Sequence, residues 1–250
     1  ILKEKGHNVT TLDLKGKNSD SDRHIVGDIR DRDTVERAAK GKDYVFHLAA
    51  TTSPPEFEDL LGEGFETNVL GTYNVLAASS RHGIKRVILA SSSSVYGSQM
   101  KISKEDDIPG KYSNFYPVSK FFNEITAKTF NFYGLETIAL RYFNTYGIGE
   151  NSKGSYSSII WKFIEDIRNG RRPVIFGDGR QKRDFIYVED TANASVLAME
   201  NGVSGEAYNV GTGKSTEFNQ IFLIIKEEMG YDGEPQYIPN PLKSYQMFTQ

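Results

Sequence analysis

The stretch Val87–Gly97, with the sequence VILASSSSVYG, decides the fold that this chain is expected to adopt. Its first half is an apolar run rich in β-branched residues, which is typical of a buried strand. Its second half brings several hydroxyl groups to the carboxyl end of that strand. Because open parallel sheets bind ligands at the carboxyl ends of their strands, these serines are predicted to lie at a binding edge.

The segment Tyr116–Lys120 opens a predicted helix that meets no breaker before Gly134. Tyr116 and Lys120 are four residues apart, so on a helix both side chains lie on one face. A serine from the strand, the tyrosine and the lysine could then meet over one pocket. A Tyr-x-x-x-Lys pair is also common on ordinary surface helices, and it is the serine-rich strand end upstream that favours a site.

Eight short motifs occur in a fixed order along nearly the whole chain. They are Leu12-Asp13, Gly27-Asp28-Ile29, His47-Leu48-Ala49-Ala50, Asn68-Val69-Leu70-Gly71-Thr72, the serine strand, Tyr116 to Lys120, Arg141-Tyr142-Phe143-Asn144 and Arg183-Asp184-Phe185-Ile186-Tyr187-Val188. Each motif is weak alone, but in this order they make a strong signal. The chain resembles the extended short-chain dehydrogenase/reductases, the NAD-dependent sugar-nucleotide epimerases and dehydratases.

The resemblance implies an α/β fold: a Rossmann-type, doubly wound parallel sheet with a smaller C-terminal α/β substrate region. The expected boundaries are 1–147 for the NAD-binding domain, to which some later segments return, and 148–250 for the mainly substrate-binding region. The Gly/Ser-rich run 147–158 marks the change between the two.

Family members begin with a strand and a glycine-rich turn, G-x-x-G-x-x-G, that binds the cofactor pyrophosphate. This sequence starts at Ile1 with what looks like the end of the helix after that turn, with Gly6 as its C-cap. We therefore expect a further strand, turn and partial helix upstream, about two dozen residues, and weak NAD binding without them.

The resemblance gives Ser92, Tyr116 and Lys120 catalytic roles, and acid–base chemistry explains them. A free tyrosine has a pKa of about 10 and is a poor base at neutral pH. A lysine ammonium nearby, like a positively charged nicotinamide ring, favours the phenolate, and lowering the pKa by about three units takes roughly 4 kcal/mol. The tyrosine could then take a proton from a sugar hydroxyl while hydride leaves the same carbon, with the serine holding that oxygen.

Residues at the ends of two early predicted strands are candidates for binding NAD. Asp13 ends the strand 8–13, where a carboxylate accepts hydrogen bonds from the adenosine ribose and would repel the 2′-phosphate of NADP. An exposed turn aspartate is the alternative. The resemblance implies that Asp28 binds the adenine amino group and that Ile29 packs on the ring. Taken alone, Asp28 would instead cap a helix at 32–39.

The next strand, 44–50, supplies further candidates for the cofactor. Leu48, Ala49 and Ala50 end it, and the small residues there would let the backbone approach NAD. His47 is interpreted as a hydrogen-bonded core histidine rather than a ligand.

A loop is predicted at 51–64 and a helix at 65–82. By resemblance Asn68 on that helix contacts the cofactor, although the pattern alone is equally consistent with a polar residue facing solvent. The resemblance also places Tyr142, at the end of the strand 136–142, near the nicotinamide.

The candidates for binding the nucleotide sugar include Asn144, which follows the strand 136–142, and Arg183. Arg183 belongs to a polar turn, 181–183, that would ordinarily be solvated surface. In the family the arginine before the aspartate at 184 clamps the diphosphate, a role that suits the planar guanidinium fork. Lys243 is the nearest candidate for a second clamp. The full substrate set is Ser92, Ser93, Tyr116, Asn144 and Arg183.

The residues after Ser92 distinguish the chemistries within the family. Dehydratases and decarboxylases of this kind typically carry Asp or Glu there, whereas this chain has Ser93 and Ser94. The nearest downstream acids, Glu105 to Asp107, belong to a polar loop. We therefore expect a UDP-glucose/UDP-galactose 4-epimerase that oxidises C4, lets the ketose turn and recycles tightly held NAD. The alternatives are another NAD-dependent sugar-nucleotide epimerase, dehydratase or reductase, and a non-catalytic nucleotide sensor.

Composition narrows the remaining possibilities. The chain has no cysteine and no Cys/His cluster, so disulfides, thiolate chemistry and a zinc site of that type are not expected. Its net charge of −3 gives no electrostatic footprint for nucleic acid. No apolar run approaches the length of a membrane span, and no signal peptide is visible. A cytoplasmic enzyme is the simplest expectation.

A homodimer is also predicted. Family members usually pair through two helices of each subunit, which here correspond to 65–82 and 116–131. Aromatic residues in and after the second helix supply more apolar surface than one helix can bury on its own sheet, namely Phe121, Phe122, Phe130 and Phe132.

Overall fold

The computed structural model describes residues 1–16, 20–98, 101–107, 111–241 and 247–250. The chain divides into two compact units. The first comprises Ile1–Val95, Asn114–Arg141 and Ala192–Tyr208, and the second comprises Tyr96–Ser113, Tyr142–Thr191 and Asn209–Gln250.

The first unit is built on parallel strands. A four-stranded sheet has the order β3-β4-β5-β9, and a separate parallel pair joins β1 to β2. The strands are β1 (Thr10–Asp13), β2 (Arg23–Val26), β3 (Tyr44–His47), β4 (Arg86–Ser92), β5 (Glu136–Tyr142) and β9 (Ala207–Val210).

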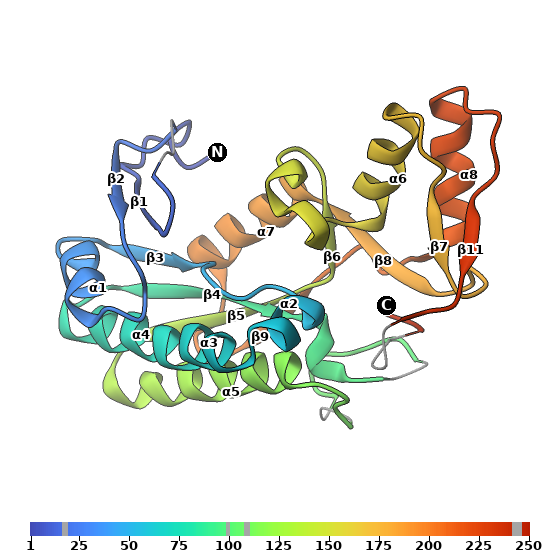
Figure 1. Ribbon diagram of the computed structural model, residues 1–250. Helices are drawn as coiled ribbons and strands as arrows, with labels where there is room; N and C mark the ends of the chain where they lie inside the picture. Colours follow the sequence, from blue (N-terminus) through green and yellow to red (C-terminus); the bar gives the residue numbers. More distant parts are fainter. Residues whose placement is uncertain (17–19, 99–100, 108–110, 242–246) are drawn as a thin grey trace. The chain divides into compact units, whose positions relative to one another are not determined.

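Helices cover both faces of this sheet (Figure 1). On one face, apolar side chains of α1, α4 and α5 form a core with alternate residues of β4 and β5, including Val87, Leu89 and Ala139. On the other face lies α7, where a side chain at Gly202 would collide with Ile138 of β5. This doubly wound α/β arrangement confirms the predicted fold class. The helices are α1 (Arg32–Ala39), α4 (Thr72–Arg81), α5 (Phe115–Phe130) and α7 (Val188–Asn201).

Local sequence explains the bounds of α5. The side chain of Asn114 caps the helix by accepting a hydrogen bond from the Tyr116 backbone N–H (3.2 Å). Lys128 lies in the last turn, where a cation is favourable, and a 3₁₀ turn (Asn131–Tyr133) follows. Gly134, at φ 81°, then ends the helical segment in the left-handed conformation that glycine tolerates best.

Two sequence predictions for the first unit were wrong. Residues 51–64 were expected to form a loop but contain α2 (Pro54–Asp59) and much of α3 (Leu61–Phe65). Ser53 caps α2, and the two prolines lie in its first turn, where proline is favoured because no N–H is needed. The cap of α1 is Asp31, whose side chain accepts from the Asp33 N–H, and not Asp28.

The helix predicted at 65–82 is present, but it includes a π-helical turn, Glu66–Gly71, before α4. A Cβ at Gly71 would lie 2.5 Å from the Ile29 side chain, so glycine permits this close approach. After β4 the chain forms a short 3₁₀ turn, Ser93–Tyr96.

The second unit contains two small sheets. One has the order β10-β8-β6, and the other pairs β11 with β7 in parallel. A core of Phe163, Ile175, Phe222 and Ile225 joins its two helices to β7. The elements are β6 (Asn144–Tyr146), a 3₁₀ turn (Glu150–Tyr156), α6 (Ile159–Arg168), β7 (Val174–Phe176), β8 (Lys182–Tyr187), β10 (Ser215–Glu217), α8 (Phe218–Glu228) and β11 (Gln236–Ile238).

A tight turn at Asp178-Gly179 follows β7, with Gly179 at φ 75° and the Asp178 side chain accepting from the Arg180 N–H (3.0 Å). It does not close a hairpin, because β7 and β8 belong to different sheets. Within the described ranges, no helix is long and apolar enough to cross a membrane.

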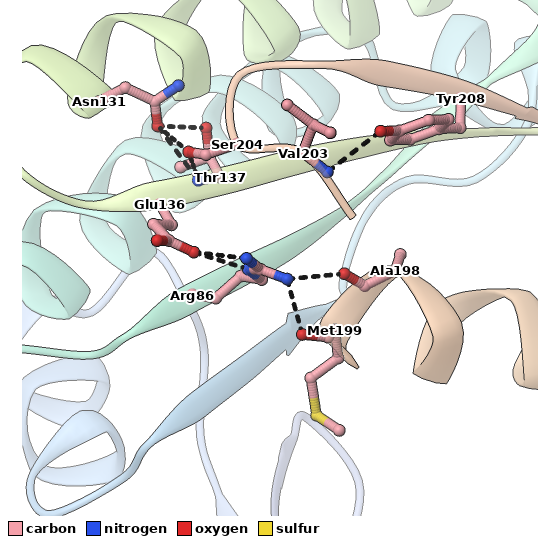
Figure 2. Close-up of polar contacts among 9 residues, drawn as sticks. All are labelled: Arg86, Asn131, Glu136, Thr137, Ala198, Met199, Val203, Ser204 and Tyr208. Carbon is pink, nitrogen blue, oxygen red and sulfur yellow. Dashed lines mark hydrogen bonds and ion pairs between the residues drawn. The ribbon is translucent and has the colours of Figure 1, made fainter. Parts of the chain in front are cut away.

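Arg86 fastens three elements of the first unit together (Figure 2). From the first position of β4, its Nε and Nη2 donate to the Glu136 carboxylate at the start of β5 (2.9 and 2.6 Å). Its Nη1 donates to the carbonyls of Ala198 and Met199 in the last turn of α7 (3.1 and 2.8 Å). Both carbonyls lie in the last turn of α7, and that of Ala198 also accepts from the Gly202 N–H (3.0 Å), so Arg86 adds to the C-terminal capping of the helix.

We predict that Arg86→Met destabilises the protein by roughly 1–3 kcal/mol, chiefly through the lost bonds to the α7 carbonyls. The Glu136 pair contributes less because that carboxylate is half exposed. Urea unfolding provides the measurement. The neighbouring Lys85→Met, which removes an exposed pair with Asp43 and an exposed contact with the Tyr44 ring, serves as a control and should have little effect. Equal unfolding free energies for the two variants would contradict this role of Arg86.

Candidate active site

The structure brings Ser92, Tyr116 and Lys120 together within the first unit. Ser92 is the last residue of β4, and its side chain is hydrogen-bonded to that of Tyr116 in the first turn of α5. Lys120 lies one turn further along, with Nζ 5.9 Å from the centroid of the Tyr116 ring. Its ammonium donates to the Ala90 carbonyl of β4 (3.0 Å). The spacing argument therefore identified side chains that do meet at the carboxyl end of a strand.

Burial dominates the electrostatics of this trio. Burial raises the pKa of Tyr116 to about 12. The hydrogen bond from Ser92 lowers this pKa, and the charge of Glu56 raises it. Burial also lowers the pKa of Lys120 to about 8, whereas the negative charge of Glu124 raises it. The expected lowering of the tyrosine pKa by Lys120 is not found. The phenol is protonated at neutral pH, so its use as a base requires additional positive charge close to the ring.

Hydroxyl side chains follow Ser92 at the end of β4. Ser92 Oγ accepts hydrogen bonds from the backbone N–H (3.2 Å) and the hydroxyl (2.9 Å) of Ser94, and Ser93 is buried beside them. Two of the downstream carboxylates are engaged within the second unit. Glu105 accepts from the Asn209 N–H (2.8 Å), and Asp107 pairs with Lys101 (2.6 Å).

The candidates for the adenosine end of NAD lie in two places in the first unit. Asp13 ends β1 with an exposed carboxylate, one oxygen of which accepts from the Lys15 N–H (2.9 Å). Asp28 is paired with Arg30 (2.7 Å), which lowers the pKa of that carboxyl. The Ile29 side chain belongs to the hydrophobic core of the first unit.

The segment after β3 is exposed to solvent, and the residue that follows it is held by hydrogen bonds with Asn68. β3 ends at His47, so Leu48, Ala49 and Ala50 form the chain beyond it, with Leu48 55% exposed. Asn68, in the π-helical turn, holds the next residue, Thr51. Its Oδ1 accepts from the Thr51 N–H (2.8 Å), and its Nδ2 donates to the Thr51 carbonyl (3.1 Å).

Asn68 is fully buried, and its Nδ2 also donates to Ser119 of α5 (3.2 Å). The interpretation of Asn68 as a polar residue facing solvent is therefore wrong. It sets the position of the exposed chain at 48–50.

These residues fit the chemistry of NAD. The bond to Ala90 uses one of the three N–H donors of the Lys120 ammonium, which leaves donors for ribose hydroxyls beside the nicotinamide. At the other end of the cofactor, the Asp13 carboxylate is an acceptor for the adenosine ribose.

His47 is a core histidine, as predicted. Its Nε2 shares a hydrogen bond with the Thr72 hydroxyl (2.8 Å), and burial, aided by the Lys120 charge, lowers its pKa to about 3. In the part of the chain that the structure describes, no group of three or more histidine, aspartate or glutamate side chains could hold a metal ion.

The candidate nucleotide-binding residues belong to the second unit. Arg183 is 8% exposed, with its guanidinium carbon 5.7 Å from the centroid of the Phe218 ring and Nη1 donating to the Lys182 carbonyl (2.8 Å). The interpretation of Arg183 as solvated surface is therefore wrong. Tyr142 ends β5, and Lys243 lies outside the described residues.

Asp184 organises the surroundings of Arg183 and was not identified from sequence. Its buried carboxylate accepts from the backbone N–H and hydroxyl of Thr212 (2.9 and 2.6 Å) and from the Gly213 N–H (2.8 Å). Asn144 donates to the Asp184 carbonyl and to the Thr249 hydroxyl (both 3.1 Å). The glycine-containing segment 211–213 is thus a turn held by the Asp184 carboxylate. Asp184 follows Arg183 directly on a predicted strand. This pair of opposite charges was the feature of the sequence that could have pointed to Asp184.

Comparisons with known proteins show which family the chain is similar to. Residues 1–211 match the NAD dependent epimerase/dehydratase family. The UDP-N-acetyl-alpha-D-glucosaminuronate decarboxylase of Bacillus cytotoxicus is 33% identical over 90% of this chain and 74% of its own length. The UDP-glucose 4-epimerase of Mycolicibacterium smegmatis is 30% identical over 94% and 79%. The structure of a UDP-glucose 4-epimerase from Thermotoga maritima with UDP-glucose is 32% identical, with a TM-score of 0.90, over 97% of this chain and 81% of that one.

We predict that His47 makes stability depend on pH. Its pKa is about 3 in the folded chain against an ordinary 6.5, so between these values the unfolded state binds more protons. Stability is then lost as the pH falls, by about 2 kcal/mol near pH 5. His47→Gln should remove this loss, measured by urea unfolding at neutral pH and near pH 5. The exposed His7→Gln is the control and should keep the wild-type dependence. An unchanged dependence in His47→Gln would contradict the prediction.

Proposed function

The chain belongs to the NAD dependent epimerase/dehydratase family, and from this premise we propose that it inverts C4 of UDP-glucose or UDP-galactose. Two observations together support the proposal. Ser92, Tyr116 and Lys120 lie close together, and the two residues after Ser92 carry hydroxyls and not acids. The family resemblance implies that enzymes that eliminate water or carbon dioxide typically carry an acid there. Oxidation and return of hydride need only the trio and the cofactor.

In the proposed reaction the Tyr116 oxygen takes the proton of the C4 hydroxyl, and Ser92 hydrogen-bonds to the same sugar oxygen. NAD, when bound, supplies a hydride acceptor and donor for C4. The Tyr116 pKa of about 12 shows how far the phenol must be shifted to act as a base near neutral pH. The Lys120 ammonium does not bring about this shift by itself, and the positive charge of a nicotinamide ring would add to it when NAD is bound. The same phenol returns the proton in the second half of the cycle.

We further propose that the first unit binds NAD and that the second binds the nucleotide. The cation–π contact with Phe218 and the bond to the Lys182 carbonyl orient the Arg183 guanidinium for bidentate contact with a diphosphate. Asn144, held by two hydrogen bonds, is a further contact for the nucleotide sugar.

The alternative within the family is another sugar-nucleotide epimerase, dehydratase or reductase, and the alternative outside enzymes is a nucleotide sensor. An assay that offers UDP-glucose and UDP-N-acetylglucosamine separately and follows both epimers by NMR discriminates among them. A sensor would bind UDP-sugar without forming any product.

Tyr116→Phe should keep the fold and lose roughly 10²–10⁴-fold in turnover, because it removes one acid–base hydroxyl and little volume. Turnover is measured as the interconversion of UDP-glucose and UDP-galactose. The matched control is Tyr133→Phe, the same change at an exposed tyrosine, which should leave turnover unaltered. Turnover of Tyr116→Phe close to that of the control would remove the tyrosine from the mechanism.

Arg183→Lys should weaken UDP-sugar binding and leave NAD binding unchanged, because lysine cannot form the bidentate fork. Calorimetric titration with UDP and with NAD measures both. Arg180→Lys, at an exposed arginine in the preceding turn, is the matched control. Identical UDP affinities for the wild type and Arg183→Lys would rule out the clamp.

We also propose that the chain forms a homodimer through α5 and the helical segment 65–82. Val118, Phe122 and Ile125 recur at helical spacing on the exposed face of α5. Phe132 is exposed as well, whereas Phe121 and Phe130 are partly buried and contribute less than expected.

Phe122→Glu should convert this dimer to a monomer, because a carboxylate in an apolar interface loses hydration without gaining a partner. Light scattering at micromolar concentration gives the mass. Ile148→Glu, at an exposed apolar residue of the second unit, is the control and should remain dimeric. A monomeric wild type would refute the proposal.

A further inference from the structure

Three consecutive residues at the carboxyl end of β4 are each tied to α5. The Ala90 carbonyl accepts from Lys120, the Ser91 hydroxyl donates to Glu124, and Ser92 is bonded to Tyr116. The three partners on α5 are four residues apart, so they form one line along a single helix face. Tyr116 thus lies one helical turn before Lys120, and Glu124 lies one turn after it.

Glu124 is itself fixed by a third element. Arg141 of β5 donates to the Glu124 carboxylate through Nε (3.1 and 3.3 Å) and Nη2 (2.8 Å). Glu124, Arg141 and Ser91 are all at least nine-tenths buried. A buried carboxylate that meets a guanidinium on one side and a serine on the other has its hydrogen bonds well satisfied.

We propose that Glu124 is a positioning residue for the reaction. Its carboxylate locks the end of β4 onto α5 through Ser91 and places a negative charge one turn behind the Lys120 ammonium. The catalytic consequence rests on the proposed function, in which Lys120 must be charged while Tyr116 handles the proton.

The charges around Lys120 support this assignment. Glu124 and Tyr116 face it from α5, and His47 faces it from β3, where burial keeps the imidazole neutral. Arg141 on β5 lies behind the Glu124 carboxylate, and Glu56 on α2 acts on Tyr116. Within this set, Glu124 is the carboxylate that opposes the effect of burial on Lys120.

The direction of the effect follows from these charges. Burial lowers the pKa of Lys120 to about 8, and Glu124 raises it. Without the carboxylate, the Lys120 pKa falls further, and the unscreened Arg141 charge acts in the same direction. The ammonium is then lost at a lower pH, so activity should fall off earlier on the alkaline side.

Glu124→Gln separates charge from shape, because glutamine keeps the volume and an acceptor for Ser91. Lysine labelled with ¹³C at Cε reports the titration of Lys120 directly, with the signal assigned by its absence in Lys120→Met. We expect its pKa to fall by about one unit in Glu124→Gln, and the alkaline limb of kcat to move with it. Ser91→Ala keeps all charges and should titrate like the wild type.

An unchanged Lys120 titration in Glu124→Gln would overturn the inference, and so would an equal shift in Ser91→Ala. If Glu124→Gln does not fold, Glu124→Met with Arg141→Met replaces the buried pair by apolar side chains, an exchange that is often neutral for stability. This double variant should also titrate below the wild type. The titration needs neither substrate nor cofactor, so a wild type without epimerase activity would refute the proposed function and leave the role of Glu124 intact.

Discussion

The burial of Lys120 against the carboxyl end of β4 is the constraint on which the candidate site depends. A charged lysine that is 5% exposed to solvent is stable only if nearby acceptors and charges replace the hydration of its ammonium. The Ala90 carbonyl and the Glu124 carboxylate do this from two elements. Burial raises the free energy of the charged lysine, and it also brings the ammonium close to Tyr116. Because the site is buried, the Lys120 pKa is sensitive to any charged group placed beside it.

The two units supply different parts of the proposed chemistry, and each part is rigid for an identifiable reason. In the first unit, hydrogen bonds from successive residues of β4 fix the face of α5 that carries Tyr116 and Lys120. In the second, the Asp184 carboxylate holds the turn 211–213, and Phe218 supports the Arg183 guanidinium. In both places a buried polar residue orients the group that is proposed to meet the ligand.

Much of this could be predicted from sequence, because local periodicity determines it. The strand at 86–92 and the shared face of Tyr116 and Lys120 follow from spacing alone. The direction of the Tyr116 pKa shift could not be predicted in this way, since burial depends on packing that spacing does not reveal. Pro54 and Pro55 suggested a loop, although proline also begins helices. Arg183 looked exposed because its aromatic partner, Phe218, is far away in sequence.

The central claim is that C4 of the sugar is oxidised and reduced while Tyr116 carries the hydroxyl proton. It is tested most directly with UDP-galactose that carries deuterium at C4, incubated with the protein and NAD in ordinary water. The UDP-glucose formed should keep its deuterium at C4, as read by ¹H NMR, because a transferred hydride does not exchange with solvent. UDP-glucose with hydrogen from water at C4 would contradict the claim.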